Sequence, residues 1–133
     1  MLFRSCDAVP PCGPLGGVLT AFQRTRAARL GFLSCDLPLI SPELIRAVVA
    51  GQGRAIFTSS AEGVGFPFAL DRSCRDAVVA AIRENNFSLQ AFAQCLRARR
   101  IRVTAAQRNQ LLNVNTPADF ARAKALARVH AAR

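Results

Sequence analysis

The sequence predicts a single α/β domain in which a mostly parallel sheet carries helices on both faces. The chain has 133 residues, which is enough for one domain with a hydrophobic core. Short apolar segments alternate with segments whose apolar residues recur at helical spacing, as in strands joined by crossover helices. Neither an internal repeat nor a Pro/Gly-rich linker divides the chain, so we expect residues 1–133 to form one domain.

The first half of the chain predicts a helix, a strand and a second helix. We expect a turn-rich stretch over 5–13, a helix over 14–30, a strand over 30–35 and a helix that begins after Ser41. Pro14 suits the first turn of a helix, because an N–H at that position has no partner within the helix. Residues 30–35 are mainly apolar and end abruptly at Asp36, as a buried parallel strand would. Ser41 is the expected helix cap, and Pro42 takes the first helical position.

The second half predicts three strands and three helices. We expect strands over 54–59, 66–70 and 101–104, and helices over 72–84, over 88–99 and after Thr116. The first two strands could form a hairpin or a bend at the sheet edge, and Pro67 argues against a central position for the second. The last helix has the clearest start, because Thr116 is a capping residue, Pro117 follows it and Asp119 lies three residues after the cap.

Charge and composition limit the classes of partner. The chain carries 18 Lys and Arg residues against 8 Asp and Glu, a net charge of +10, which attracts anions. Tyr and Trp are absent, so the pattern of basic and aromatic residues that stacks nucleic acid bases is missing, and we expect no nucleic acid partner. No apolar stretch is long enough for a membrane helix, so we expect no membrane partner either.

Cysteine usage and the first residues predict a cytoplasmic location. The five cysteines are an odd number and include no C-x-x-C pair, which favours neither a zinc site nor a disulfide framework. The apolar start of the chain is too short and too soon interrupted for a signal peptide. We therefore expect the reducing environment of the cytoplasm.

Asp36 is a candidate metal ligand. In an open α/β sheet, ligands bind at the carboxyl ends of strands, and Asp36 follows the predicted strand over 30–35. Mg²⁺ that bridges triphosphate oxygens takes one or two carboxylates together with phosphate and water. By position alone, Asp36 could equally cap the turn before Pro38.

The glycine-rich segment 13–17 is a candidate anion or nucleotide site. Its backbone lies at a predicted helix start, where unpaired N–H groups and the helix dipole favour a negative charge. Tight packing of the helix against the sheet explains such glycines as well. Asp7 could accept a hydrogen bond from a base or sugar, or form a turn.

Asn113 and Asn115 are candidate substrate ligands. They lie two residues apart, so in an extended segment their amides point the same way. Such a pair could hold a pterin edge or a phosphate, or could serve to cap the helix that follows.

Three segments taken together resemble the MobA-like NTP transferases, the family of the molybdenum cofactor guanylyltransferases. They are Gly-Pro-Leu-Gly-Gly at 13–17, Cys-Asp-Leu-Pro at 35–38 and Asn-Val-Asn-Thr-Pro-Ala-Asp at 113–119, in the family's order and at about its spacing. The first two are shared with other nucleotidyltransferases, and the third combined with them is fairly specific. The resemblance covers essentially the whole chain. It implies a three-layer α/β/α, Rossmann-like fold of the nucleotide-diphospho-sugar transferase type.

The resemblance also implies a reaction, in which GMP passes from Mg²⁺-bound GTP to the terminal phosphate of molybdopterin and pyrophosphate is released. Asp36 would be the catalytic carboxylate and the Mg²⁺ ligand, and Asn113 and Asn115 would face the pterin. The nucleotide-binding residues would be Asp7, Gly13, Pro14, Leu15, Gly16, Gly17 and Asp36. GTP and molybdopterin would be the substrates, and a molybdoenzyme or another protein of cofactor biosynthesis a further partner.

The sequence departs from the family pattern in two places. The family's first strand and its loop L-A-G-G-x-S-x-R-M-G-x-D-K, which wraps the triphosphate, have no counterpart, so we expect an exposed strand edge and weak nucleotide binding. Phe66 precedes Pro67 where the family commonly has a histidine. Two alternatives therefore stay open: an inactive remnant that binds a pterin or a partner protein, and a related nucleotidyltransferase that uses CTP or a phospho-acid acceptor.

Overall fold

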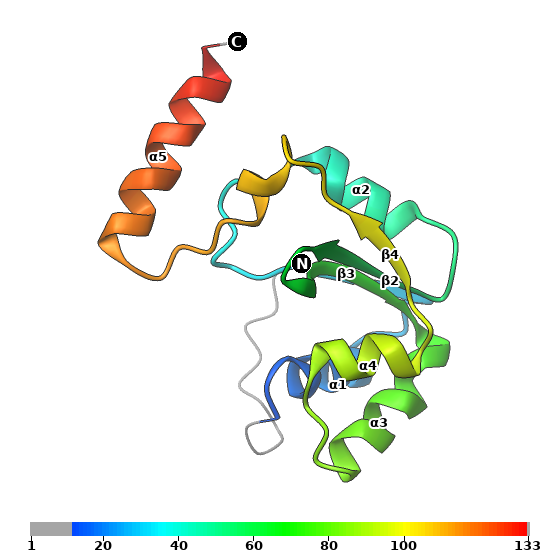
Figure 1. Ribbon diagram of the computed structural model, residues 1–133. Helices are drawn as coiled ribbons and strands as arrows, with labels where there is room; N and C mark the ends of the chain where they lie inside the picture. The colour runs from blue at the N-terminus through cyan, green and yellow to red at the C-terminus, as the bar shows by residue number, and fades with distance from the viewer. Residues whose placement is uncertain (1–11, 133) are drawn as a thin grey trace.

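The computed structural model describes residues 12–132, which form a sheet covered by helices on both faces (Figure 1). The strands are β1 (Arg29–Phe32), β2 (Ala55–Ser60), β3 (Gly63–Asp71) and β4 (Arg99–Arg102). The α-helices are α1 (Pro14–Arg24), α2 (Pro42–Ala50), α3 (Arg75–Arg83), α4 (Leu89–Cys95) and α5 (Pro117–Ala131). Two short 3₁₀ helices are η1 (Arg72–Cys74) and η2 (Arg108–Leu111). The predicted α/β class is confirmed.

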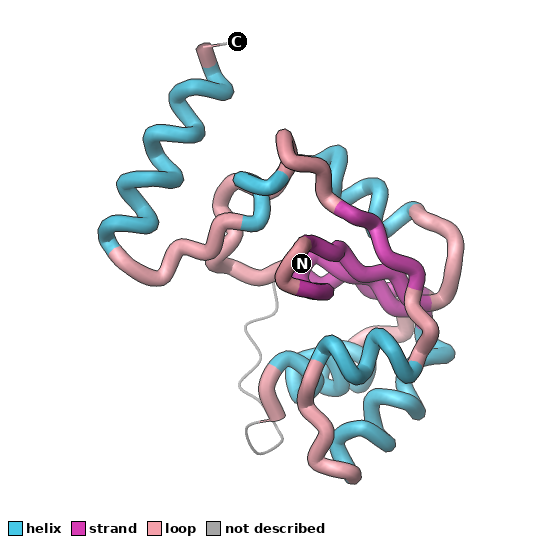
Figure 2. The backbone as a smooth tube through the Cα atoms, viewed as in Figure 1, coloured by secondary structure: helices cyan, strands magenta, loops and turns pink. Residues whose placement is uncertain are grey.

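The sheet is mixed, with the strand order β1-β3-β2-β4 (Figure 2). β3 pairs antiparallel with both β1 and β2, and β2 pairs parallel with β4. Thus β1, β2 and β4 point the same way and β3 points the opposite way. The pairing of β2 with β3 is a hairpin, one of the two arrangements that the sequence left open.

Two apolar clusters hold the three layers together. On one face, α1, α3 and α4 pack on a core that includes Phe57 and Phe68, both fully buried. Their rings stack with centroids 4.7 Å apart. On the other face, α2 buries Leu44 and Val48 against Ile56 and Ala69. The alternation of side chains along β2 explains the division, since Ile56 and Phe57 are neighbours that point to opposite faces.

The expectation that Pro67 excludes its strand from the sheet centre is wrong. β3 has a neighbour on each side, and the register with β2 shifts between Phe57 and Thr58, so Phe66 and Pro67 fall in a bulge. A proline is tolerated in a bulge because the ladder hydrogen bonds are already interrupted there. The buried Thr58 hydroxyl donates a hydrogen bond of 2.7 Å to the Pro67 carbonyl, which gives that main-chain group a partner.

The predicted boundaries around β1 also change. The first helix ends at Arg24 rather than near residue 30, because Thr25 is extended and the chain then turns into β1. Among the described residues β1 lies at the sheet edge, is half-buried and pairs antiparallel, so it is not the buried parallel strand that the apolar run predicted. Three residues separate its end from Asp36.

Helix α5 stands away from the rest of the domain (Figure 1). Ala123 is its one buried residue, and Phe120 and Val129 are 61% and 53% exposed. Its start is as predicted, with a capping box between Thr116 and Asp119. No helix in residues 12–132 has the length and apolar character needed to cross a bilayer.

Candidate functional site

A polar pocket of about 350 Å³ lies at the end of the sheet where β2 ends, and its lining includes Leu111 of the cluster under α2 and Val64 and Phe66 of the cluster on the other face. Thr58 and Ser60 reach it because even-numbered residues of β2 share the side of Ile56. Its lining residues are Ser34, Asp36, Leu37, Thr58, Ser60, Glu62, Gly63, Val64, Gly65, Phe66, Leu111 and Asn113. Three segments distant in sequence therefore meet here: the loop after β1, the β2–β3 turn and the segment before α5.

Two hydrogen bonds from main-chain N–H groups join the loop after β1 to the segment before α5. The N–H of Val114 donates a hydrogen bond of 2.9 Å to the carbonyl of Asp36. The N–H of Ser41 donates one of 3.1 Å to the side-chain oxygen of Gln110. These contacts bring Asp36 and Asn113, two of the predicted site residues, into one pocket.

The polar side chains of the described pocket lining are carboxylates, hydroxyls and one amide. Asp36 and Glu62 supply carboxylates, Asn113 an amide, and Ser34, Thr58 and Ser60 hydroxyls. The Ser34 hydroxyl donates a hydrogen bond to Oδ1 of Asp36, which orients that carboxylate. Within residues 12–132, neither lysine nor arginine lines the pocket, although the chain as a whole has a net charge of +10. The pocket is thus locally acidic in a basic protein.

This set of oxygen ligands fits Mg²⁺ better than zinc or iron. Hard oxygen ligands suit Mg²⁺, whereas zinc and iron sites recruit cysteine or histidine, and neither occurs among the described residues of the lining. No three His, Cys, Asp or Glu side chains gather anywhere in the described part of the chain. A site with one or two carboxylates leaves the remaining positions to phosphate and water, as is usual for Mg²⁺ that accompanies a nucleotide.

The glycine segment lies apart from this pocket. Residues 13–17 are absent from its lining, and α1 packs on the sheet face opposite α2. In Figure 1, however, α1 begins at the end of the sheet where the loop after β1 lies. Gly13 has a φ of 58° and is exposed, and α1 has no side-chain cap, so the first N–H groups of the helix are not taken by a capping side chain. The side chain of Leu15 is fully buried, so only its backbone could meet a ligand.

Two other predicted residues do not join the pocket. Asn115 is exposed and does not line it, and the Asn115 main-chain N–H donates to the Asp119 carboxylate 3.2 Å away. Asp7 lies outside the residues that the structure describes.

The comparison with protein families identifies the chain's relatives. The sequence model of the MobA-like NTP transferase domain matches residues 3–108. The chain belongs to this family. The matched range contains the glycine segment and Asp36 and ends before Asn113.

Individual MobA-like relatives agree with this assignment. A molybdenum cofactor guanylyltransferase of Xanthomonas euvesicatoria pv. vesicatoria is 30% identical over 119 residues, which cover 87% of this chain and 63% of the relative. A probable molybdenum cofactor guanylyltransferase of Flavobacterium johnsoniae is 37% identical over 60 residues, covering 42% of this chain and 32% of the relative. The chain therefore spans less than two thirds of the length of these relatives.

Solved structures show the same MobA-like fold. Molybdopterin-guanine dinucleotide biosynthesis protein A from Archaeoglobus fulgidus has a TM-score of 0.67 and 18% identity, covering 85% of this chain and 62% of that one. A protein of Aquifex aeolicus VF5 also has a TM-score of 0.67 and 18% identity, covering 86% of this chain and 59% of that one. At this identity the shared feature is the fold.

Sequence reasoning missed the contribution of the β2–β3 turn to this pocket. Glu62, Thr58 and Ser60 line it, although each looked like an ordinary strand or turn residue. The sequence Thr-Ser-Ser-Ala-Glu at 58–62 places several oxygen-bearing side chains at the end of a strand. This cluster could have indicated that the turn contributes to a polar site.

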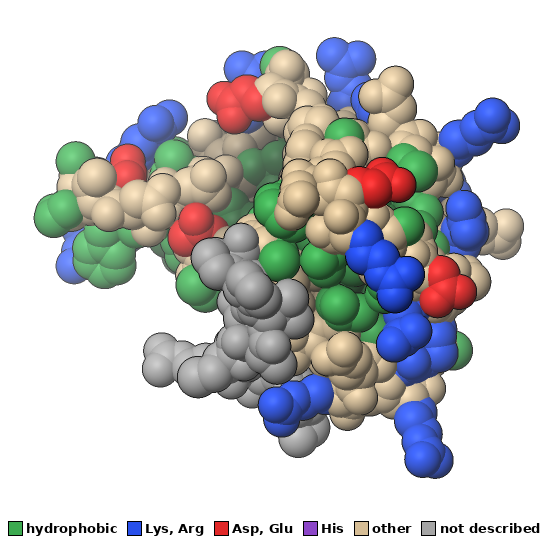
Figure 3. Space-filling view, turned by 90° about the horizontal axis from the view of Figure 1, so that it is seen from below, with side chains coloured by type: hydrophobic (Ala, Val, Ile, Leu, Met, Phe, Trp, Pro, Cys, Tyr) green, Lys and Arg blue, Asp and Glu red, His purple; other side chains and the backbone are tan. Residues whose placement is uncertain are grey.

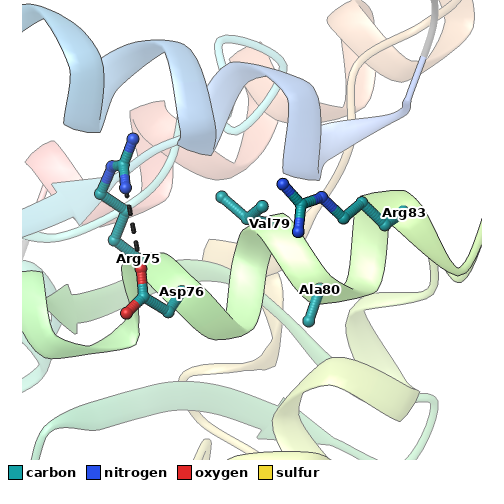
Figure 4. Close-up of a pocket in the computed structure, with 5 residues that line it drawn as sticks. All are labelled: Arg75, Asp76, Val79, Ala80 and Arg83. Atoms are coloured by element: carbon teal, nitrogen blue, oxygen red, sulfur yellow. Dashed lines mark ion pairs between the residues drawn. The ribbon is translucent and has the colours of Figure 1, made fainter.

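A second depression, of about 330 Å³, lies on α3 and is lined by Arg75, Asp76, Val79, Ala80 and Arg83 (Figure 4). Both arginines extend toward α1, and Arg75 pairs with the exposed Asp76 at 3.7 Å. It contains none of the family motifs. On the face seen in Figure 3, several basic side chains gather along the right side of the molecule, with an acidic side chain beside them.

Proposed function

We propose that this chain provides the acceptor side and metal site of a nucleotidyltransferase that moves GMP from Mg²⁺-bound GTP to molybdopterin. The observation that supports it most is that Asp36 and Asn113, from two separate family motifs, line one pocket of hard oxygen donors. The names of the relatives point to the same substrates.

In this proposal Asp36 holds Mg²⁺, with the Ser34 hydroxyl fixing the orientation of its carboxylate. The metal would neutralise charge on the phosphoryl group as it is transferred. Asn113 would donate its amide hydrogens to the acceptor substrate. Among the described residues, the lining has hydroxyl groups but no His or Lys beside them that could activate a nucleophile, so the proposal includes no covalent intermediate with the protein. The role of the protein is then to position the substrates.

The nucleotide would lie toward the start of α1. N–H groups without a capping side chain suit a phosphate, and Gly13 and Gly17 leave open space, since a Cβ added to either would meet no atom within 4 Å. GTP is preferred over CTP in this proposal because the named relatives are guanylyltransferases.

A second candidate is a binding module that holds a pterin without transferring a nucleotide. It is favoured by one observation, the lack of any lysine or arginine among the described residues of the pocket that could hold a triphosphate.

Metal binding tests the proposal directly. Mn²⁺ replaces Mg²⁺ at oxygen sites and is visible by electron paramagnetic resonance, so a titration gives its affinity for the chain. We expect Asp36→Asn to weaken Mn²⁺ binding about tenfold or more, since the neutral amide removes the ligand charge. Glu84→Gln is the matched control, because Glu84 is exposed and lies outside the pocket. Equal affinity in Asp36→Asn and the wild type would disprove the metal role.

Assays with nucleotide and with molybdopterin then distinguish the transferase from the binding module. With Mg²⁺ present, GTP should raise the melting temperature more than CTP, and molybdopterin should cause pyrophosphate release from GTP. Pterin binding without pyrophosphate release would favour the binding module. Equal shifts with GTP and CTP would contradict the preference for guanine.

A further inference from the structure

The first half of β3 has one open side. Among the described residues 12–132, β1 pairs only with residues 68–71 of β3, so residues 63–66 have β2 on one side and no described strand on the other. Main-chain groups on an open strand side need other partners when they are partly buried. The segment matters because Glu62, Gly63, Val64, Gly65 and Phe66 form one continuous wall of the polar pocket.

Gln90 of α4 fills this open side as a strand would. Its Oε1 accepts a hydrogen bond of 2.9 Å from the N–H of Val64, and its Nε2 donates one of 2.7 Å to the carbonyl of Val64. One carboxamide thus satisfies both main-chain groups of a single residue, and the Val64 side chain is buried in the core on the α4 face. The position of the wall is therefore tied to a helix.

Gly63 makes room for this contact. Its φ is 117°, and a Cβ at this position would lie 2.6 Å from both Oε1 and Nε2 of Gln90. Any other residue would have to displace the carboxamide and adopt a strained backbone. Gly63 and Gln90 are therefore matched, although they lie on different elements.

We propose that Gln90 is a positioning residue for the acceptor substrate: it holds the wall 62–66 at the distance from Asp36 and Asn113 that a pterin needs. This inference rests on the proposed function. Gln90 does not itself line the pocket, so it acts through Val64. Asp36, the metal ligand of the proposed function, lies in the loop after β1, whereas the wall belongs to the β2–β3 turn and β3, so the wall can move without displacing that ligand.

Fluorescence of a phosphorylated pterin provides the test, because the protein has no Trp or Tyr that would contribute background. Gln90→Met keeps the length of the side chain and removes both hydrogen bonds. Gln94→Met is the matched control: Gln94 is exposed on the same helix, and its side chain makes no hydrogen bond within residues 12–132. We expect Gln90→Met to weaken pterin binding about tenfold, since small displacements of positioning groups have effects of that size or larger. Gln94→Met should bind like the wild type.

Affinity for Mn²⁺ separates positioning from a general loss of structure. Positioning predicts that Gln90→Met leaves Mn²⁺ affinity unchanged while pterin affinity falls. Unchanged pterin affinity, or a parallel fall in pterin affinity, Mn²⁺ affinity and unfolding midpoint, would overturn the inference. A wild type that does not bind the pterin would refute the proposed function and this inference with it. If Gln90→Met does not fold, Gln90→Glu, which keeps the acceptor for the Val64 N–H and repels its carbonyl, is measured by the same criteria.

Discussion

The main-chain N–H of Val114 and the main-chain carbonyl of Asp36 are 2.9 Å apart and hydrogen-bonded. Because the contact uses main-chain groups, it survives any change of the Asp36 side chain. The main-chain contact that joins the two sides of the pocket is therefore retained in Asp36→Asn. We expect an effect of this substitution on binding to reflect the loss of the carboxylate charge.

The neighbouring contact, from the Ser41 N–H to the Gln110 side chain, depends on a side chain and can be removed. We expect Gln110→Ala to lower the free energy of unfolding by about 1 kcal/mol, because the partly buried N–H loses its acceptor. Urea denaturation measures this loss. Gln52→Ala, a change at an exposed glutamine outside the pocket, should leave the midpoint unchanged. Equal effects of the two substitutions would show that the contact contributes nothing.

Thr58 stabilises the bulge that lets Pro67 occupy a central strand. In Thr58→Val the shape of the side chain is retained, but the Pro67 carbonyl loses its 2.7 Å partner. We expect a loss of about 1–3 kcal/mol in the free energy of unfolding, the cost of a buried unsatisfied group. The control is Thr20→Val, because the equally buried Thr20 hydroxyl donates to Gly16, whose carbonyl also accepts a helical N–H. A smaller loss for Thr58→Val than for Thr20→Val would contradict this account.

Arg72 fixes the end of α1. Its guanidinium donates to the carbonyls of Phe22, Thr25 and Ala27, the first and last at 3.3 and 3.1 Å. Lysine cannot reach three separated carbonyls with one ammonium group. We therefore expect both Arg72→Ala and Arg72→Lys to lower the free energy of unfolding by about 2 kcal/mol or more, measured by urea denaturation.

Arg75→Ala is the control for the substitutions of Arg72. Within residues 12–132, the one ion pair of Arg75 is with an exposed carboxylate at 3.7 Å, so Arg75→Ala should lower the free energy of unfolding by less than about 0.5 kcal/mol. A lysine at position 72 that restores full stability would mean that charge alone, rather than the shape of the guanidinium, holds the helix end.

Local chemistry explains which parts of the fold were predictable. The starts of α2 and α5 were predicted because the caps Ser41 and Thr116 lie next to the N–H groups that they satisfy. The end of α1 was missed because its partner, Arg72, is distant in sequence. The central position of β3 was missed for the same reason, since the bulge at Pro67 depends on Thr58 of another strand.

The site, too, combines residues that local motifs predicted with residues whose place depends on distant parts of the chain. Asp36 and Asn113 were recognisable from motifs, and the structure brings them together through a contact that no pattern in the sequence reports. Glu62 was missed because its place in the pocket depends on the pairing of β2 with β3. The roles assigned to Asp36 and Asn113 remain predictions, as do those of Asp7, Asn115 and the glycine segment.

The pH dependence of α5 provides the last prediction. Hydrogen bonding to the Thr116 side chain, and then to the main-chain N–H of Asn115, lowers the pKa of Asp119 below its ordinary value of 3.8. A lowered pKa in the folded state means that the carboxylate stabilises the helix above pH 3.8 and that this contribution is lost as the pH falls through the folded-state pKa. Because α5 buries only Ala123, we expect helicity to fall on acidification before the core unfolds. Circular dichroism between pH 6 and pH 2 follows the helix. Asp119→Ala should start with lower helicity at pH 6 and lack the acid step, whereas Asp76→Ala, at an exposed carboxylate of α3, should keep it. An acid step that persists in Asp119→Ala would assign the transition to another carboxylate, because the capping box is the feature that couples this helix to pH.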